Sequence, residues 1–241
     1  MKSRLDKLLS ANGFGSRKEI KRLLKDRVVA VNGVRRVDPS TDVDPELDAI
    51  TLDGEPLRIL TTVYLMLNKP AGVISSTEDP DHRTVIDVLG EPWASMDLFP
   101  IGRLDVDTEG LLVITNDGPL THRLTSPKTG VDKTYYARLR DPVDDAALAS
   151  YREAFRAGVP FRDGHVCLPA KIDRCGDEAD GVIVTIQEGK YHQVKKMFYV
   201  VGNEVAYLKR ESMGNLSLDP ALKPGEFREL TSDELALLRG E

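Results

Sequence analysis

The apolar residues of this 241-residue chain occur in short runs, and this feature restricts its fold more than any other. Runs such as Leu111–Thr115 and Phe198–Val201 are far below the roughly 18 residues of a membrane-spanning helix. Because strands and helices mix without regular βα alternation, we expect an α+β fold rather than a doubly wound sheet. The expected strands are 28–31, 48–52, 64–68, 73–75, 111–115, 134–139, 182–186, 205–208 and 216–218, and the expected helices are 4–12, 17–25, 84–89, 191–201 and 233–239.

The charge of the chain is unevenly distributed. With 33 Lys and Arg against 39 Asp and Glu, the formal net charge is −6, which taken alone argues against a nucleic-acid binder. Residues 1–36, however, contain eleven basic and three acidic side chains, a net charge of +8 that leaves −14 for the rest. The first residues include no apolar segment, so we expect no secretory signal and a cytoplasmic protein.

Residues 17–25 predict a helix with two different faces. Ser16 and Glu19 can form a capping box at its start. Three apolar side chains would face a core, and the cations on the other side indicate phosphate binding; a merely solvated basic face is the alternative. These cations are Lys18, Lys21, Arg22 and Lys25.

The first 60 residues predict a small module of two helices and short strands. Asn32-Gly33 follows the strand 28–31 and is typical of a tight hairpin turn. Together with Arg4-Leu5-Asp6-Lys7 and Ser16-Arg17, this turn resembles the S4 domain, an RNA-binding module. The resemblance implies a domain of residues 1–60 that grips the RNA backbone, followed by a second domain of residues 61–241. The expected RNA-binding residues of the first domain are Arg4, Lys7, Ser16, Arg17, Lys18, Lys21, Arg22, Lys25 and Asn32.

A charged loop, Phe99–Gly110, precedes the apolar strand 111–115. It contains three carboxylates and Arg103, and the glycines near its ends permit unusual backbone turns. Loops supported by a rigid strand often carry function, although a charged surface loop with local ion pairs is the alternative. The spacing does not decide which carboxylate matters.

The familiar cofactor and metal motifs are absent. The sequence has no Walker loop, no Rossmann fingerprint and no HExxH motif. Cys167 and Cys175 do not form a CxxC pair, and the four histidines have no ligand spacing. We therefore expect no cofactor, no metal site and a chemistry performed by side chains alone.

Several ordered motifs resemble those of the pseudouridine synthases. Gly102-Arg103-Leu104-Asp105, followed by Thr108-x-Gly110, is similar to the signature loop of this family. The segments 79–85 and 122–127 resemble the branch that modifies small-subunit rRNA, so the chain is identified as a member of the RsuA family. The other matching motifs are Leu67–Gly72, Lys133–Tyr135 and Glu188–Phe198.

The resemblance implies a catalytic domain with a mixed, mainly antiparallel sheet, and it assigns roles to three residues. Asp105 would be the catalytic carboxylate, acting as a nucleophile or as a base. Lys195 would hold it ionised; the alternative is that Lys195 only faces phosphate. Tyr135 would stack on the displaced base and help to remove a proton, while Tyr136 points to the opposite face of the strand and is the better core candidate.

Further residues of the second domain are expected to contact RNA. Arg103 resembles the family arginine that holds the place of the flipped nucleotide, and other cations would extend a basic track near the site. The RNA-binding residues expected here are His82, Arg103, Lys190, Lys196, Lys209 and Arg210.

The implied reaction is the isomerisation of a specific uridine, position 516 of 16S rRNA, after the base has been flipped from its stack. The implied partner is 16S rRNA or a small-subunit assembly intermediate, with no membrane, and the chain is expected to be monomeric. Three alternatives stay open: a 23S rRNA pseudouridine synthase, a non-catalytic S4-type rRNA-binding factor, and an N-glycoside hydrolase that uses Asp107 or Glu109 as a second acid.

Overall fold

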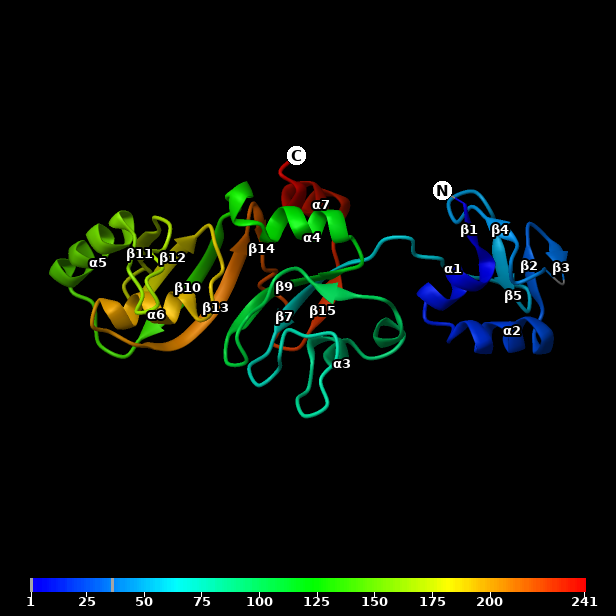
Figure 1. The fold of residues 1–241 in the computed structure, drawn as a ribbon, viewed down its shortest axis with the longest axis horizontal. Coiled ribbons are helices and arrows are strands. Elements are labelled where there is room, and N and C mark those ends of the chain that lie inside the picture. The colour runs from blue at the N-terminus through cyan, green and yellow to red at the C-terminus, as the bar shows by residue number, and fades with distance from the viewer. Residues whose placement is uncertain (1, 36) are drawn as a thin grey trace. The chain divides into compact units, whose positions relative to one another are not determined.

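The computed structural model describes residues 2–35 and 37–241, which form two compact units (Figure 1). The first unit runs to Val63 and also includes Ile86–Phe99; the second contains Tyr64–Val85 and the chain from Pro100 to Glu241. Each unit has a hydrophobic core of its own. The expected α+β class is confirmed. Within the described residues, no helix is both long and apolar enough to cross a lipid bilayer.

The first unit packs two helices against short strands. The Ser16 hydroxyl accepts a hydrogen bond from the Glu19 backbone N–H, and the Glu19 carboxylate accepts one from the Ser16 backbone N–H, so the expected capping box is present. Asn32 and Gly33 have φ values of 51° and 78°, the geometry of a tight turn with two left-handed residues. The elements are α1 (Leu5–Ala11), α2 (Arg17–Asp26), the pair β1 (Ser3–Arg4) and β4 (Asp42–Val43), the sheet β3 (Val34–Arg35), β2 (Val29–Val31), β5 (Ile50–Leu52) and β6 (Glu55–Pro56), and the 3₁₀ turn η1 (Trp93–Ser95).

The second unit is built on a nine-stranded mixed sheet in the order β11-β12-β10-β13-β9-β7-β15, with β8 beside β9 and β14 beside β13. All its strand pairs with a stated register are antiparallel except β13 with β9. The bounds are β7 (Tyr64–Lys69), β8 (Phe99–Pro100), β9 (Glu109–Thr115), β10 (Lys133–Leu139), β11 (Lys171–Arg174), β12 (Gly181–Ile186), β13 (Val205–Met213), β14 (Leu216–Ser217) and β15 (Phe227–Glu229).

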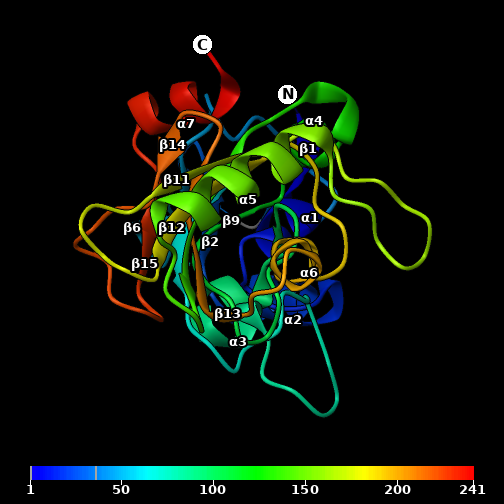
Figure 2. The same cartoon turned by 90° about the vertical axis from the view of Figure 1, so that its left-hand side faces the viewer.

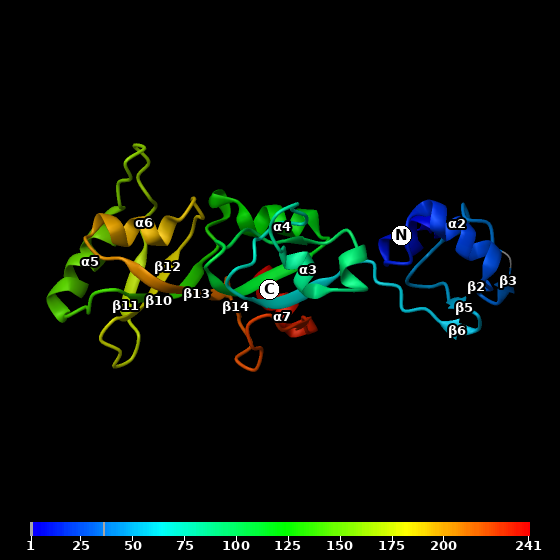
Figure 3. The same ribbon diagram turned by 90° about the horizontal axis from the view of Figure 1, so that it is seen from below.

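Helices cover the sheet at two places. Leu120 of α4 and Leu238 of α7 pack into the core formed by β7, β9 and β14, and both helices lie over these strands in Figure 1. Phe155 of α5 contacts Phe198 of α6, with ring centroids 5.3 Å apart, next to the strands β10 to β12 (Figures 2 and 3). The helical elements of the second unit are α4 (Gly118–Thr125), η2 (Pro127–Thr129), α5 (Asp145–Ala157), α6 (Gln193–Val200) and α7 (Ser232–Arg239). The short helix α3 (Val85–Leu89) lies at the boundary and belongs to the first unit from Ile86 onward.

The parallel contact between β13 and β9 determines where the charged loop can lie. Gly110 pairs with Arg210 at this contact, and a Cβ atom at Gly110 would lie 2.3 Å from the Arg210 carbonyl oxygen. Gly110 also has a φ of 101°, in a region that side chains disfavour. Only glycine therefore fits here, and the loop before β9 emerges at the junction of two antiparallel halves of the sheet.

Several expectations from the sequence are wrong in detail. Residues 73–75 form no strand and contribute only an isolated bridge between Ile74 and Thr84. Tyr136 is half-buried and donates a 2.5 Å hydrogen bond to Glu178, whereas Tyr135 is the buried tyrosine. The helices α4 and α5 and the strands β1, β3, β4, β6, β8, β11 and β15 were not expected.

Candidate active site

One buried lysine, Lys69, stabilises the loop between β8 and β9 by hydrogen bonds to its backbone. The ammonium of Lys69, which has no solvent exposure, donates to the carbonyl oxygens of Thr108, Pro70 and Val106 at 2.9, 3.0 and 3.4 Å. Burial lowers the pKa of Lys69 to about 8, against the opposing effect of nearby carboxylates such as Asp107. Sequence reasoning missed this role, although the motif Leu67–Gly72 contains Lys69.

Other hydrogen bonds fix the shape of the loop around Asp105. Ser75 Oγ accepts from the Leu104 N–H and donates to the Leu104 carbonyl, both at 3.0 Å. The Thr108 N–H donates to the Asp105 carbonyl at 3.1 Å. Leu104 is buried while Asp105 remains about one quarter exposed, so the loop presents the carboxylate at its surface.

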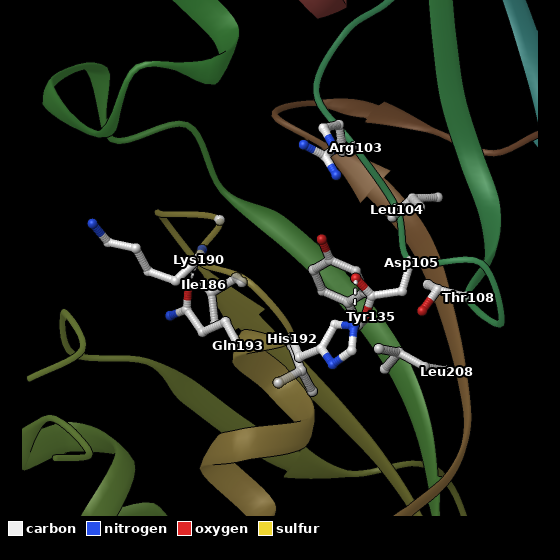
Figure 4. Close-up of a pocket in the computed structure, with 12 residues that line it drawn as sticks. Arg103, Leu104, Asp105, Thr108, Tyr135, Ile186, Lys190, His192, Gln193 and Leu208 are labelled. Carbon is white, nitrogen blue, oxygen red and sulfur yellow. Dashed lines mark hydrogen bonds and ion pairs between the residues drawn. The ribbon is translucent and has the colours of Figure 1, made fainter. Parts of the chain in front are cut away.

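Asp105 lies between two basic side chains. Lys195 Nζ, from α6, is 3.2 Å from Asp105 Oδ2. His192 Nε2 is 3.6 Å from Asp105 Oδ1, as Figure 4 shows. Lys195 also contacts Asp107 Oδ1 at 2.5 Å. Although burial opposes it, this contact holds the pKa of Asp107 below its usual value. The expected pairing of Lys195 with Asp105 is thus present, and Lys195 is shared between two carboxylates.

Tyr135 lines the same cavity from β10. It is 7% exposed, and its ring lies beside the Asp105 carboxylate with Ile186 and Leu208 around it (Figure 4). The cavity, about 50 Å³, shares Arg103, Asp105 and further lining residues with an adjacent groove of about 650 Å³. The three expected catalytic residues are therefore brought together in one place.

His192 is a residue of this site to which sequence reasoning gave no role. It adopts a left-handed backbone conformation with a φ of 53°, and its ring stacks on Tyr191 with centroids 3.8 Å apart. A non-glycine residue with positive φ stores backbone strain and often marks a functional position. The signal that could have identified it is its place in the motif 188–198.

The expected RNA-binding residues of the first unit are all exposed, but some are used by the fold itself. Ser16 caps α2, and the Asn32 amide binds Asp48 at 2.8 Å. Arg4 pairs with Asp6 at 2.7 Å. The remaining residues present their side chains to solvent: Lys7, Arg17, Lys18, Lys21, Arg22 and Lys25.

In the second unit, one expected RNA contact does not fit the structure. Arg210 is 1% exposed and donates from Nε to the Leu111 carbonyl at 2.8 Å, so it lies in the core rather than on a basic track. Lys209 is half-buried and pairs with Glu211 at 3.0 Å. The other residues keep accessible surface: Arg103 and Lys190 at the groove, His82 beside Asp79, and Lys196 over the rings of Phe161 and Tyr191.

Two family models match the chain. The model described as RNA pseudouridylate synthase matches residues 63–199, and the S4 domain model matches residues 3–48. A relative from Bacillus subtilis (strain 168), an uncharacterized RNA pseudouridine synthase named YtzG, is 49% identical over 98% of both chains. Ribosomal small subunit pseudouridine synthase A of Escherichia coli (strain K12) is 42% identical, over 97% of this chain and 98% of that one.

A solved structure agrees with these relatives. The crystal structure of a pseudouridylate synthase superposes with a TM-score of 0.68 at 38% identity, covering 98% of this chain and 99% of that chain. The family match includes both the loop that carries Asp105 and the helix that carries Lys195. The chain therefore belongs to the RNA pseudouridylate synthases, isomerases that act on RNA, and carries an S4 domain at its N-terminal end.

Proposed function

We propose that this protein converts one uridine of 16S rRNA, uridine 516, to pseudouridine, with Asp105 as the catalytic carboxylate. The observation that carries the proposal is the position of Asp105 beside Tyr135, held by Lys195 at 3.2 Å and open to a groove. The small-subunit relatives at 41–42% identity support the choice of 16S rRNA.

The reaction needs no external reactant. The bond between N1 of uracil and C1′ of the ribose breaks, the base rotates, and a bond forms between C5 and C1′. The proton on C5 is then lost, while N1 regains one. Asp105 attacks as a nucleophile or removes a proton as a base, and either role requires the ionised carboxylate.

Lys195 serves as the counter-ion of Asp105 in the complex. Bound RNA surrounds the loop with phosphate charge, which the ammonium of Lys195, 3.2 Å from Asp105 Oδ2, offsets at close range. His192 Nε2 lies 3.6 Å from the other carboxylate oxygen. Tyr135 offers a ring face to the displaced base and a hydroxyl for proton transfer at C5.

The two parts of the chain would have different functions. We assign RNA tethering to residues 1–60 and catalysis to residues 61–241. The exposed cations of α2 would contact rRNA phosphates, while the groove beside Asp105 would receive the flipped uridine. The substrate is 16S rRNA or a small-subunit assembly intermediate, and the protein would act as a monomer in the cytoplasm.

Pseudouridine mapping of total rRNA tests the proposal. A strain that lacks this chain should lose one pseudouridine in 16S rRNA, and expression of the intact chain should restore it. Asp105→Asn should restore none, whereas Asp107→Asn should restore most of it, because Asp107 only shares Lys195. Loss of a 23S rRNA site would instead favour a large-subunit synthase. An unchanged map would favour a non-catalytic rRNA-binding factor or a hydrolase.

A further inference from the structure

Three side chains of metal-binding type converge beside the active-site segment. The candidate ligand atoms of His165, Cys167 and Glu188 all lie within 4.8 Å of one another. His165 and Cys167 come from the turn that precedes β11, and Glu188 follows the end of β12. Cys167 and Glu188 are each 3% exposed, so the cluster is not a chance grouping on the surface.

Backbone hydrogen bonds set the positions of the two turn residues. The Phe161 N–H donates to the His165 carbonyl at 2.7 Å, and the Cys167 N–H donates to the Val159 carbonyl at 3.0 Å. These bonds close the turn without any contribution from the His165 or Cys167 side chains. The Cys167 thiol hydrogen-bonds with Glu188 and Gln193, so a metal ion would replace these contacts within a turn whose backbone is already fixed.

Glu188 is oriented so that one carboxylate oxygen faces the cluster. Its Oε1 accepts hydrogen bonds from the Leu168 N–H and from Gln193 Nε2, both at 2.9 Å. Its Oε2 lies 3.5 Å from His165 Nε2. Outer hydrogen bonds that fix the unused oxygen of a ligating carboxylate are a regular feature of metal sites.

The environment of His165 Nε2 is independent evidence for a bound ligand. The atom is buried, yet it makes no hydrogen bond with any of the described residues. In tetrahedral zinc sites, with bonds of about 2.0–2.2 Å to nitrogen and oxygen, neighbouring ligand atoms lie about 3.4 Å apart. The 3.5 Å between His165 Nε2 and Glu188 Oε2 corresponds to one edge of such a tetrahedron.

We propose that His165, Cys167 and Glu188 bind one divalent transition-metal ion of the zinc type. A thiolate, an imidazole and a carboxylate suit Zn²⁺ and disfavour Mg²⁺ and Ca²⁺, which prefer oxygen ligands. Three protein ligands leave a fourth position for water. The expectation of no metal site rested on ligand spacing in the sequence, whereas here the fold joins two separate segments.

A protonated Cys167 thiol is a poor metal ligand, and metal binding favours the thiolate form. Burial, together with the Glu188 carboxylate, raises the pKa of Cys167 to about 12. A coordinating metal removes the thiol proton, so binding of each ion releases one proton from Cys167 to solvent.

The consequence for the protein is structural. Glu188 leads directly into Gly189 and Lys190, which line the cavity of Asp105. An ion held by all three ligands would fasten the turn at residues 159–168 to the start of this segment. The site would support the active-site geometry without contacting the substrate.

Cobalt(II) titration of the intact, reduced protein tests this proposal, since Co²⁺ reports a thiolate ligand by its charge-transfer absorption. The wild type should bind one Co²⁺ with this absorption, and Zn²⁺ should displace it. Cys167→Ser should lose the charge-transfer band. Cys175→Ser is the matched control, because Cys175 is a free, half-buried cysteine outside the cluster, and it should keep the band.

His165→Gln provides a second variant that does not disturb the core, because the His165 side chain is one third exposed. Loss of an outer-shell partner already weakens metal binding by about 10–100-fold, so loss of this ligand should weaken Co²⁺ binding at least tenfold. The proposal is overturned if the wild type binds no Co²⁺ with thiolate absorption. It is equally overturned if Cys167→Ser binds like the wild type or if Cys175→Ser loses the band. Each of those results would leave His165 and Glu188 as an ion pair only.

Discussion

The two units of the molecule differ in the solvent exposure of their lysine side chains. In the first unit, cations such as Lys18, Lys21 and Lys25 are exposed on α2. In the second unit, Lys69 and Lys133 lie inside the protein, at 0% and 6% exposure.

The difference shows two uses of the same side chain. An exposed ammonium keeps its hydration and acts on distant phosphates through a field that salt screens. A buried ammonium loses its hydration, so it persists only where carbonyl oxygens or carboxylates replace the water. The first arrangement suits tethering of a polyanion, and the second, at Lys69, fixes the geometry of the loop that carries Asp105.

Replacement of a buried lysine should have the largest effect. Lys69→Met leaves the carbonyl groups of Pro70, Val106 and Thr108 without their donor. The hydrogen bond to Thr108 is buried and the other two are part-buried. At about 1–3 kcal/mol for a buried unsatisfied group, the free energy of unfolding should fall by about 2–3 kcal/mol. Pseudouridine formation should be lost, and hydrogen exchange should accelerate in β9.

Lys21→Met is the matched control for this change. Its side chain is exposed, so the free energy of unfolding should change by less than about 0.5 kcal/mol. Urea denaturation and hydrogen exchange measure both variants. Equal stability of the two would mean that the contacts of Lys69 do not hold the loop.

Replacement of Lys133 should have a smaller effect on the free energy of unfolding, and this effect should depend on pH. Burial and the charge of Arg210 lower the pKa of Lys133 to about 8. Its unfolded pKa is near 10.5, so between these values the unfolded state binds more protons and stability rises with pH. The shift corresponds to about 3.4 kcal/mol, and the lost hydrogen bond to the Val131 carbonyl offsets about 1 kcal/mol of it. Lys133→Met should therefore be more stable than the wild type at pH 7 by about 2 kcal/mol, and this gain should disappear as the pH approaches 10.5.

Urea denaturation at pH 7, 9 and 10.5 measures this difference. Lys18→Met, at an exposed position, should show no such trend. A Lys133→Met variant that is less stable than the wild type at pH 7 would show that hydrogen bonding by Lys133, to the Val131 carbonyl at 3.2 Å, outweighs its loss of hydration.

Local features were predictable because neighbours in the sequence make them. The capping box of Ser16 and Glu19 and the turn at Asn32-Gly33 need no information from distant residues. The helix α5 carried a readable signal as well, since its buried residues Leu148 and Phe155 lie on one face. The helix α5 was therefore predictable from its own residues.

Non-local features were not predictable from pattern alone. Arg210 reads as a surface cation in the sequence, but its pairing with Gly110 of β9 places it in the core. Tyr136 lies on the less buried face of β10, where it donates a hydrogen bond to Glu178, 42 residues away. The pairing of Asp105 with Lys195 was expected only because both lie in motifs that resemble a known family, since spacing did not distinguish between the carboxylates.

Replacement of the exposed lysines of α2 should have the smallest effect. Its effect on rRNA binding shows whether this basic face contacts RNA or is only solvated. Replacement of Lys18, Lys21 and Lys25 by Gln should leave stability unchanged but weaken binding to a 16S rRNA fragment about tenfold at low salt. The slope of log affinity against log salt is negative, and each lost phosphate contact reduces its magnitude by about 0.7–0.9. Arg22 is left in place because it pairs with Asp26 at 3.3 Å.

The matched control removes three lysines from the second unit instead. Lys128, Lys171 and Lys223 are equally exposed but lie on three separate segments, so their replacement by Gln removes the same charge without removing a shared face. Fluorescence anisotropy at several KCl concentrations should show a flatter salt slope for the α2 variant than for this control. Equal slopes would show that only net charge matters, and the basic face of α2 would then be a solvated surface with no tethering role.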